Sequence, residues 1–162
     1  MCGIIGILSD QPAAPRLVEA LKRLEYRGYD SAGVALLEAG KLKRLRAPGK
    51  LNNLDEKVRE LPLKAGVGIG HTRWATHGQP NETNAHPHAS GKVAIVHNGI
   101  IENFRELREA MEARGRKFET ETDSETIAHL IDEGLSKGLK PKDAFKATLD
   151  QLRGAFAIAA II

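Results

Sequence analysis

The chain has 162 residues, of which 41% are hydrophobic and 28% charged, a composition typical of one soluble globular domain. A single cysteine excludes an internal disulfide, and no apolar run is long enough to cross a bilayer, so we expect a cytoplasmic protein with no membrane contact. The net charge of +3 comes from basic residues interleaved with acidic ones, and only 4% of residues are aromatic, which argues against nucleic-acid binding.

The N-terminal half alternates apolar runs with helical patterns. Residues 3–8 predict a short buried strand. Apolar residues recur at helical spacing after two prolines, which predicts an amphipathic helix over residues 16–27. The apolar stretch 32–37, followed by a glycine and then by leucines among basic residues, predicts a hairpin. A short polar helix is expected over 54–61. The glycine-rich run 65–71 predicts a further strand, in which the glycines indicate close packing rather than a nucleotide-binding loop.

The C-terminal half opens with a long irregular segment. Residues 73–91 have no periodicity and are rich in His, Asn, Thr, Pro and Gly, which predicts a functional loop, and residues 92–99 then resume as a strand. Asn103, followed three residues later by Glu106, predicts a capping box at the start of a helix. Three more elements are expected, two helices and a final apolar strand, over residues 127–135, 144–152 and 154–162.

The order of these elements predicts the fold class. Hairpins are mixed with helices instead of repeating strand–helix units, which favours a layered α+β fold over a doubly wound parallel sheet. No internal repeat or linker divides residues 1–162, so we expect one domain. The chain stops at Ile162 inside its most apolar run, whereas natural termini tend to be polar. We therefore expect a domain that is truncated at its C-terminus.

Cys2 lies directly behind the initiator methionine. Removal of Met1 would leave a residue with both a thiol and a free α-amine, whose ordinary pKa values are about 8.5 and about 8. The amine can then act as the base for its own side chain, as in enzymes with a terminal nucleophile. The alternative is a chance cysteine at a frayed end, but the strand beginning at Gly3 ties this end into a sheet.

Other residues suit an attack on the side-chain amide of an amino acid. At the end of a strand, the Asn98 amide and the Gly99 backbone N–H can stabilise an oxyanion. Arg73 can hold a carboxylate through two hydrogen bonds. Asp123 can pair with an ammonium group, cap the helix that follows it, or do both. A ligand with a carboxylate and an ammonium group is an α-amino acid.

The six histidines are weaker candidates for a site. They show neither a cysteine pair nor carboxylates at ligand spacing, so we expect no metal and no cofactor. Hydrogen bonding within loops is the expected role for these side chains.

Six motifs in chain order closely resemble the glutamine–fructose-6-phosphate aminotransferase family: MCGIIGI, LEYRGYDSAG, HTRWATHG, NAHPH, HNGIIENF and ETDSETIAHLI. The match runs from end to end and indicates the N-terminal glutaminase domain of that family, which is a class II amidotransferase domain and an N-terminal nucleophile hydrolase. The resemblance implies a four-layer αββα sandwich with mainly antiparallel sheets. It also implies a homodimeric parent, whose sugar-phosphate isomerase domains bind fructose 6-phosphate and are absent from these residues.

The resemblance further implies a role for each matching residue. Cys2 would attack the glutamine amide and give a thioester and ammonia, with its own amine as the base. Asn98 and Gly99 match the oxyanion hole of the family. Arg73 and Asp123 match the groups that bind the carboxylate and the amine of glutamine.

Four more residues match family positions around the substrate. Thr76 and His77 fall in the loop that closes over glutamine, and Trp74 matches the aromatic residue that couples the site to the ammonia channel. Arg27 matches an arginine that helps to orient the terminus.

Two alternatives to this function remain at the level of the sequence. One is the glutaminase domain of a phosphoribosyl pyrophosphate amidotransferase, which differs in the HTRWATHG and HNGIIEN motifs. The other is a non-catalytic relic of the fold, against which the joint retention of the nucleophile and its partners argues.

Overall fold

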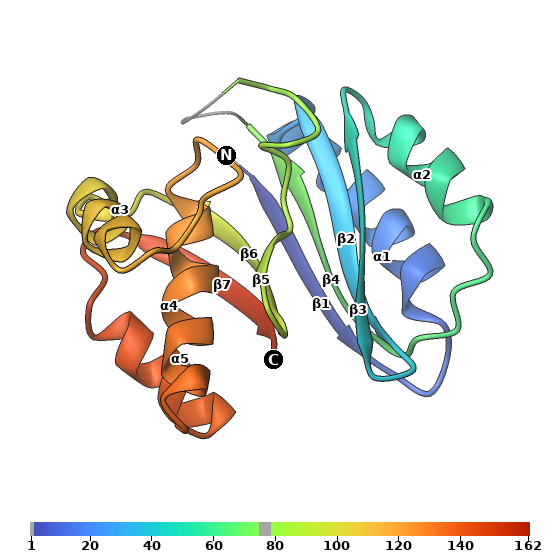
Figure 1. The fold of residues 1–162 in the computed structure, drawn as a ribbon. Coiled ribbons are helices and arrows are strands. Elements are labelled where there is room, and N and C mark those ends of the chain that lie inside the picture. The colour runs from blue at the N-terminus through green and yellow to red at the C-terminus, as the bar shows by residue number, and fades with distance from the viewer. Residues whose placement is uncertain (1, 75–78) are drawn as a thin grey trace.

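A computed structural model describes residues 2–74 and 79–162 of the chain. Two antiparallel sheets pack face to face, and helices cover the outer face of each sheet (Figure 1). All of the strand pairs in the described part of the chain are antiparallel. The predicted α+β sandwich with αββα layers is therefore confirmed.

The first sheet has the strand order β1-β4-β2-β3. Its strands, in chain order, are β1 (Gly3–Leu8), β2 (Ser31–Glu38), β3 (Lys41–Pro48) and β4 (Val67–Arg73). The predicted hairpin is confirmed as β2 and β3. Gly3 pairs with Thr72, which places Cys2 beside the end of β4.

Two helices cover the outer face of this sheet, α1 (Ala13–Lys22) and α2 (Leu51–Arg59). The prediction that the first helix spans 16–27 is wrong at both ends. It begins earlier because Pro15 lies in its first turn, where a backbone N–H has no helical partner to lose. It ends before a separate 3₁₀ turn, Glu25–Arg27.

The glycines of β4 allow α1 to lie close to the sheet, as the sequence predicts. A Cβ atom at Gly68 would come within 2.7 Å of Leu17 Cδ1, and one at Gly70 within 3.1 Å of Leu21 Cδ1. These distances are shorter than ordinary carbon contacts, so a larger residue at either position would require the leucine side chains of α1 to shift.

The second sheet has the order β5-β6-β7, with β5 (His88–Ser90), β6 (Val93–Gly99) and β7 (Phe156–Ile161). Its outer face is covered by α3 (Phe104–Ala113), α4 (Ser124–Ser136) and α5 (Pro141–Leu149). The prediction that residues 73–91 form one irregular loop is wrong in two respects: Arg73 is the last residue of β4, and β5 lies within the segment.

The capping box predicted at Asn103 is also wrong. Its side chain makes no capping bond to α3. Instead its amide donates to the Gln151 carbonyl and accepts from the Arg153 N–H, both at 2.9 Å. Asn103 therefore ties the start of α3 to the segment that leads into β7.

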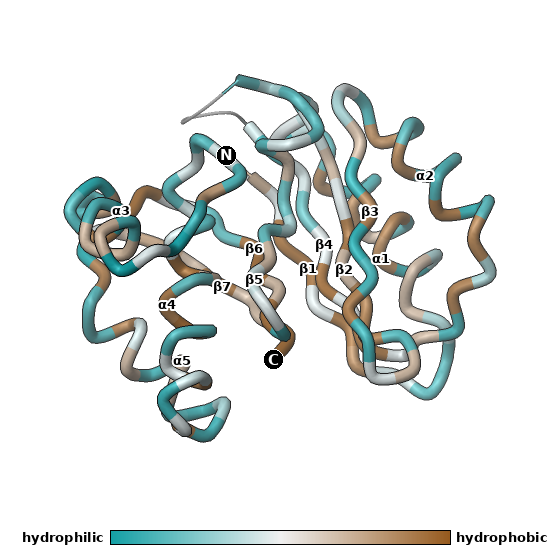
Figure 2. The backbone as a smooth tube through the Cα atoms, viewed as in Figure 1, coloured by the Kyte–Doolittle hydropathy of each residue, from teal (hydrophilic) through white to brown (hydrophobic). Residues whose placement is uncertain are grey.

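Apolar residues form three clusters, one between each pair of adjacent layers (Figure 2). Leu17 and Leu36 lie in the cluster between the first sheet and its helices. Ile69 and Val96 lie between the two sheets, and Ile127 of α4 lies in the cluster between the second sheet and its helices. Within the described residues, no helix is both long and apolar enough to span a membrane.

Candidate active site

A pocket of about 210 Å³ opens where β1 begins and where β4 and β6 end. Six of the predicted site residues line it, and they are Cys2, Arg73, Trp74, Asn98, Gly99 and Asp123. The predicted residues Thr76 and His77 lie outside the described residues. The fold thus brings together groups that lie far apart in the chain, from Cys2 to Asp123.

The Cys2 thiol contacts the backbone at the end of β4. The Trp74 N–H donates to Cys2 Sγ at 3.2 Å, and Sγ lies 3.6 Å from the Trp74 carbonyl oxygen. Burial raises the pKa of the Cys2 thiol above its ordinary value, and the Trp74 N–H opposes that change without cancelling it. The thiol is therefore protonated at neutral pH, and a nucleophilic reaction at Sγ needs a base nearby.

Asn98 and Gly99 lie at the end of β6, opposite Cys2. The Asn98 side-chain amide donates to the Cys2 carbonyl oxygen at 3.2 Å. Gly99 has a φ of +133°, and a Cβ atom there would lie 2.2 Å from the Ala155 carbonyl oxygen. Only glycine fits this position, because both the backbone conformation and the close approach of β7 exclude a side chain.

Arg73 supplies a positive charge to the pocket. The residue is 3% exposed, and its guanidinium donates to the Gln79 carbonyl oxygen at 3.1 Å. Burial lowers the pKa of Arg73 from 12.5, while Cys2, Asp30 and Asp123 act in the opposite direction. A guanidinium stays charged at neutral pH under such conditions and can bind a carboxylate.

Asp123 supplies the opposite charge. Its Oδ2 accepts the Ile101 N–H at 2.9 Å, and its Oδ1 accepts the Ser124 hydroxyl at 3.3 Å. Although Asp123 is the N-cap residue directly before α4, its side chain makes no capping bond to that helix. The interpretation of this carboxylate as a helix cap is therefore wrong. Its oxygens bond instead to the Ile101 N–H, two residues past the end of β6, and to the Ser124 hydroxyl, and Asp123 lines the pocket.

Trp74 and Arg27 lie at the margin of the site. The Trp74 side chain is 47% exposed, and its ring meets Tyr29 edge to face at 5.7 Å. Arg27 is partly buried in the 3₁₀ turn and is not among the residues that line the pocket. The turn itself packs closely on the site, since a Cβ atom at Gly28 would lie 2.7 Å from the Arg73 carbonyl carbon.

Four buried histidines lie at the pocket, and they are His71, His86, His88 and His97, of which His86 and His97 line it. The His86 ring stacks on His71 at 4.1 Å and meets His88 at 4.4 Å. Burial lowers the pKa of His71 to about 3 and holds those of His86 and His88 well below 6.5. Their expected confinement to loops is wrong for His71, His88 and His97, which lie in β4, β5 and β6.

Comparison with known proteins identifies the family of this chain. Residues 71–161 match the family model of the glutamine amidotransferase domain. The chain belongs to this family. The resemblance seen in the motifs is thereby confirmed, and the chain is an amidotransferase domain.

The amidotransferase domain is 62% identical over 162 residues to the isomerizing glutamine–fructose-6-phosphate aminotransferases of Gluconobacter oxydans and Caulobacter vibrioides. These matches cover 99% and 100% of the chain but only 27% of each relative. The chain thus spans about a quarter of the length of these curated relatives.

Solved structures place the fold among the class II amidotransferases. The glutamine phosphoribosylpyrophosphate amidotransferase of B. subtilis superimposes with a TM-score of 0.84 at 28% identity, over 99% of this chain and 35% of its own. A class-II glutamine aminotransferase domain protein from Silicibacter pomeroyi, at 19% identity and a TM-score of 0.54, shares the fold.

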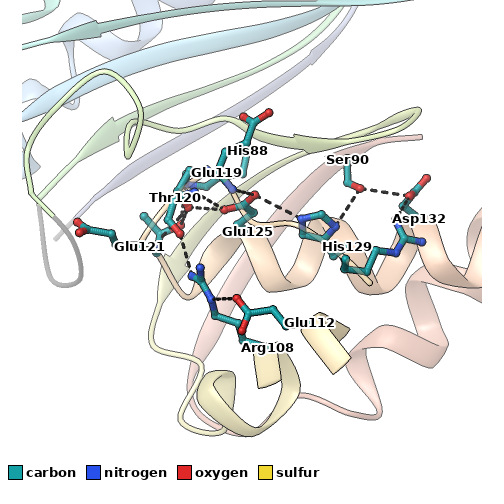
Figure 3. Close-up of polar contacts among 12 residues, drawn as sticks. His88, Ser90, Arg108, Glu112, Glu119, Thr120, Glu121, Glu125, His129 and Asp132 are labelled. Carbon is teal, nitrogen blue, oxygen red and sulfur yellow. Dashed lines mark hydrogen bonds and ion pairs between the residues drawn. The ribbon is translucent and has the colours of Figure 1, made fainter. Parts of the chain in front are cut away.

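Glu125 anchors the segment of the amidotransferase domain that leads to Asp123 (Figure 3). Its carboxylate accepts the N–H groups of Glu119 and Thr120 at 2.8 and 2.7 Å, and the Thr120 hydroxyl at 2.7 Å. His129 Nε2 lies 3.3 Å away on the next turn of α4. These bonds outweigh the effect of burial and lower the pKa of Glu125 to about 2.

Replacing Glu125 with glutamine should lower the free energy of unfolding by about 2 to 4 kcal/mol, because an NH₂ group would then face backbone donors in a buried site. Urea unfolding at pH 7 measures this change. Glu112→Gln is the control, since Glu112 forms an exposed ion pair with Arg108 and should contribute less than about 1 kcal/mol. Equal losses in the two variants would contradict this role of Glu125.

The contribution of Glu125 also has a defined pH dependence. Its folded pKa of about 2 lies below its ordinary value of 4.5, so the unfolded chain binds the proton first as the pH falls. The stabilisation is therefore complete above about pH 4.5 and is lost toward pH 2. The difference between the Glu125→Gln variant and the wild type should narrow over the same range.

Proposed function

We propose that this domain hydrolyses the side-chain amide of glutamine to glutamate and ammonia, with Cys2 as the nucleophile once Met1 has been removed. The observation that supports this most directly is one pocket lined by a thiol, a guanidinium and a carboxylate, from Cys2, Arg73 and Asp123. An α-amino acid would place its carboxylate at Arg73 and its ammonium at Asp123, which leaves the side-chain amide for Cys2.

In the first half of the reaction, the terminal amine takes the proton of the Cys2 thiol. The thiolate then attacks the amide carbon, and the negative charge moves to the amide oxygen, which accepts hydrogen bonds from Asn98 and the Gly99 N–H. The Asn98 amide carries two hydrogens, so one can stay on the Cys2 carbonyl while the other binds the oxyanion. The carbon–nitrogen bond then breaks, and the nitrogen receives the proton from the amine. Ammonia is released, and the glutamyl group remains bound to Cys2 as a thioester.

In the second half, water replaces ammonia. The terminal amine takes a proton from water as its oxygen attacks the thioester carbon, and the same donors again bind the oxyanion. The carbon–sulfur bond then breaks, glutamate leaves, and the proton returns to the Cys2 sulfur.

The remaining predicted residues are assigned to the same substrate. Trp74, at the rim of the pocket, would couple the site to the path that ammonia takes, and Thr76 and His77 would close over glutamine. Arg27 would orient the terminus through the turn that packs against Arg73.

For the intact protein we propose transfer of the ammonia to fructose 6-phosphate, as the names of the relatives state for them. The sugar phosphate would bind to sugar-phosphate isomerase domains outside residues 1–162, in a cytoplasmic homodimer. Transfer to phosphoribosyl pyrophosphate is the second candidate. It has less support, because the relatives named for fructose 6-phosphate are 62% identical and the phosphoribosylpyrophosphate enzyme is 28% identical.

The test combines an activity assay with covalent labelling. Intact-mass measurement first establishes that Met1 is absent, and glutamate and ammonia are then measured with glutamine as the substrate. A glutamine analogue with a diazoketone in place of the amide should label the protein at Cys2, as mapped by peptide mass spectrometry. Label at any other residue, or no release of glutamate, would contradict the proposed function.

A further inference from the structure

The Ser124 hydroxyl lies at the centre of a buried hydrogen-bond network beside the pocket. The residue is 1% exposed, and its Oγ donates to Asp123 Oδ1 at 3.3 Å. Two imidazole rings meet the same oxygen, His86 through Nε2 at 2.9 Å and His97 through Nδ1 at 2.7 Å. One hydroxyl therefore joins two histidines to the carboxylate that is proposed to bind the amine.

The number of available protons determines the direction of each bond. A carboxylate can only accept, so the single hydroxyl proton of Ser124 goes to Asp123. Both rings must then donate to Oγ, which assigns the proton of His86 to Nε2 and that of His97 to Nδ1. Because the pKa of His86 lies well below 6.5, its ring makes this bond as a neutral donor.

The neighbouring bonds hold the same arrangement in place. His71 Nε2 lies 2.9 Å from the His97 carbonyl oxygen, which can only accept, so His71 carries its proton on Nε2. The Ile101 N–H fixes the second oxygen of Asp123 at 2.9 Å. Each carboxylate oxygen thus has a neutral donor that orients it and leaves its charge for a ligand.

We propose that Ser124 is a positioning residue, which receives hydrogen bonds from His86 and His97 and directs the Asp123 carboxylate toward the α-ammonium group of the substrate. This inference rests on the proposed function, in which Asp123 binds that ammonium. It predicts that Ser124 contributes to the recognition of ligands with an α-amine and not to the recognition of the rest of the molecule.

Two inhibitors separate recognition of the α-ammonium group from recognition of the rest of the ligand. L-glutamate carries the α-ammonium, and glutarate has the same two carboxylates without it. The experiment uses the intact protein with Met1 removed. Ser124→Ala should raise the inhibition constant of glutamate and the KM of glutamine about tenfold, since loss of a hydrogen bond to a charged group weakens binding by about this factor or more. The inhibition constant of glutarate and kcat should stay within about threefold.

Thr126→Val is the matched control. Thr126 lies two residues further along the same helix and is fully buried, and its hydroxyl oxygen has no hydrogen-bond partner among the described residues. This variant should leave both inhibition constants unchanged. Ser124→Cys fills nearly the same volume with a weak donor, and it should lower the preference for glutamate over glutarate even if the alanine variant does not fold.

The outcomes distinguish this inference from the function on which it rests. A wild-type protein that does not hydrolyse glutamine would overturn the proposed function. With an active wild type, equal weakening of glutamate and glutarate in the Ser124 variants would show a merely structural role and overturn this inference alone. Unchanged constants in the Ser124 variants would also overturn it.

Discussion

Replacing Cys2 with alanine should reduce glutamine hydrolysis at least about 1,000-fold in kcat, because the residue that forms the thioester is lost. The affinity for glutamate should change little, since Arg73 and Asp123 remain. The thiol contacts only the backbone of Trp74 among the hydrogen bonds of the described residues, so the free energy of unfolding should change by less than about 1 kcal/mol. Ammonia release measures the loss of kcat, direct binding of glutamate to the variant measures the affinity, and urea unfolding measures the stability.

The matched control keeps the thiol and displaces the base. A preparation that retains Met1 has the same Cys2 side chain, but its free amine belongs to the preceding residue. Burial already raises the pKa of this thiol, so the loss of the adjacent base should leave it protonated and inactive. Glutamine turnover within tenfold of the wild type, in either the alanine variant or the Met1-retaining protein, would contradict the proposed mechanism.

The parts of the fold that could be predicted have a strong local pattern. The apolar runs at β1, β2, β6 and β7 and the glycine-rich β4 have such patterns, and all of them are strands. The strand β5 was not predictable, because His88–Ser90 is too short to show a period and follows a proline. Helix α1 starts before its predicted residue because a proline is as compatible with a first turn as with a boundary.

The residues of the site also differ in how far the sequence could predict them. Cys2, Asn98 and Arg73 could be predicted, since each has an unusual chemical group or lies at a strand end. Ser124 could not, because its partners His86 and His97 lie 38 and 27 positions away in the chain and no local spacing links them. Its role depends on how α4 packs against β6 and the segment before β5, which is a property of packing and not of any motif.

The buried histidines make the domain sensitive to mild acid. His71 has an ordinary pKa of 6.5 in the unfolded chain and about 3 in the fold. Below pH 6.5 the unfolded chain therefore binds a proton that the folded domain excludes. The contribution of His71 to the free energy of unfolding is complete above this pH and decreases as the pH falls toward 3. At pH 5 the loss from His71 alone is about 2 kcal/mol. His86 and His88 act in the same direction, because burial and the neighbouring positive charges disfavour their protonated forms.

Urea unfolding at several values between pH 7.5 and 5 should show this loss as a steady decrease of the unfolding free energy. Carboxylates do not account for it, since in the unfolded chain they bind protons near pH 4. His88→Gln is the control variant, because glutamine can still meet the Thr122 hydroxyl, which lies 3.2 Å from His88 Nε2, but cannot titrate. The stability of this variant should decrease less steeply than that of the wild type as the pH is lowered.

A wild-type stability that stays constant from pH 7.5 to 5 would show that the rings are protonated inside the fold. It would also contradict the neutral His86 on which the assignment of Ser124 depends.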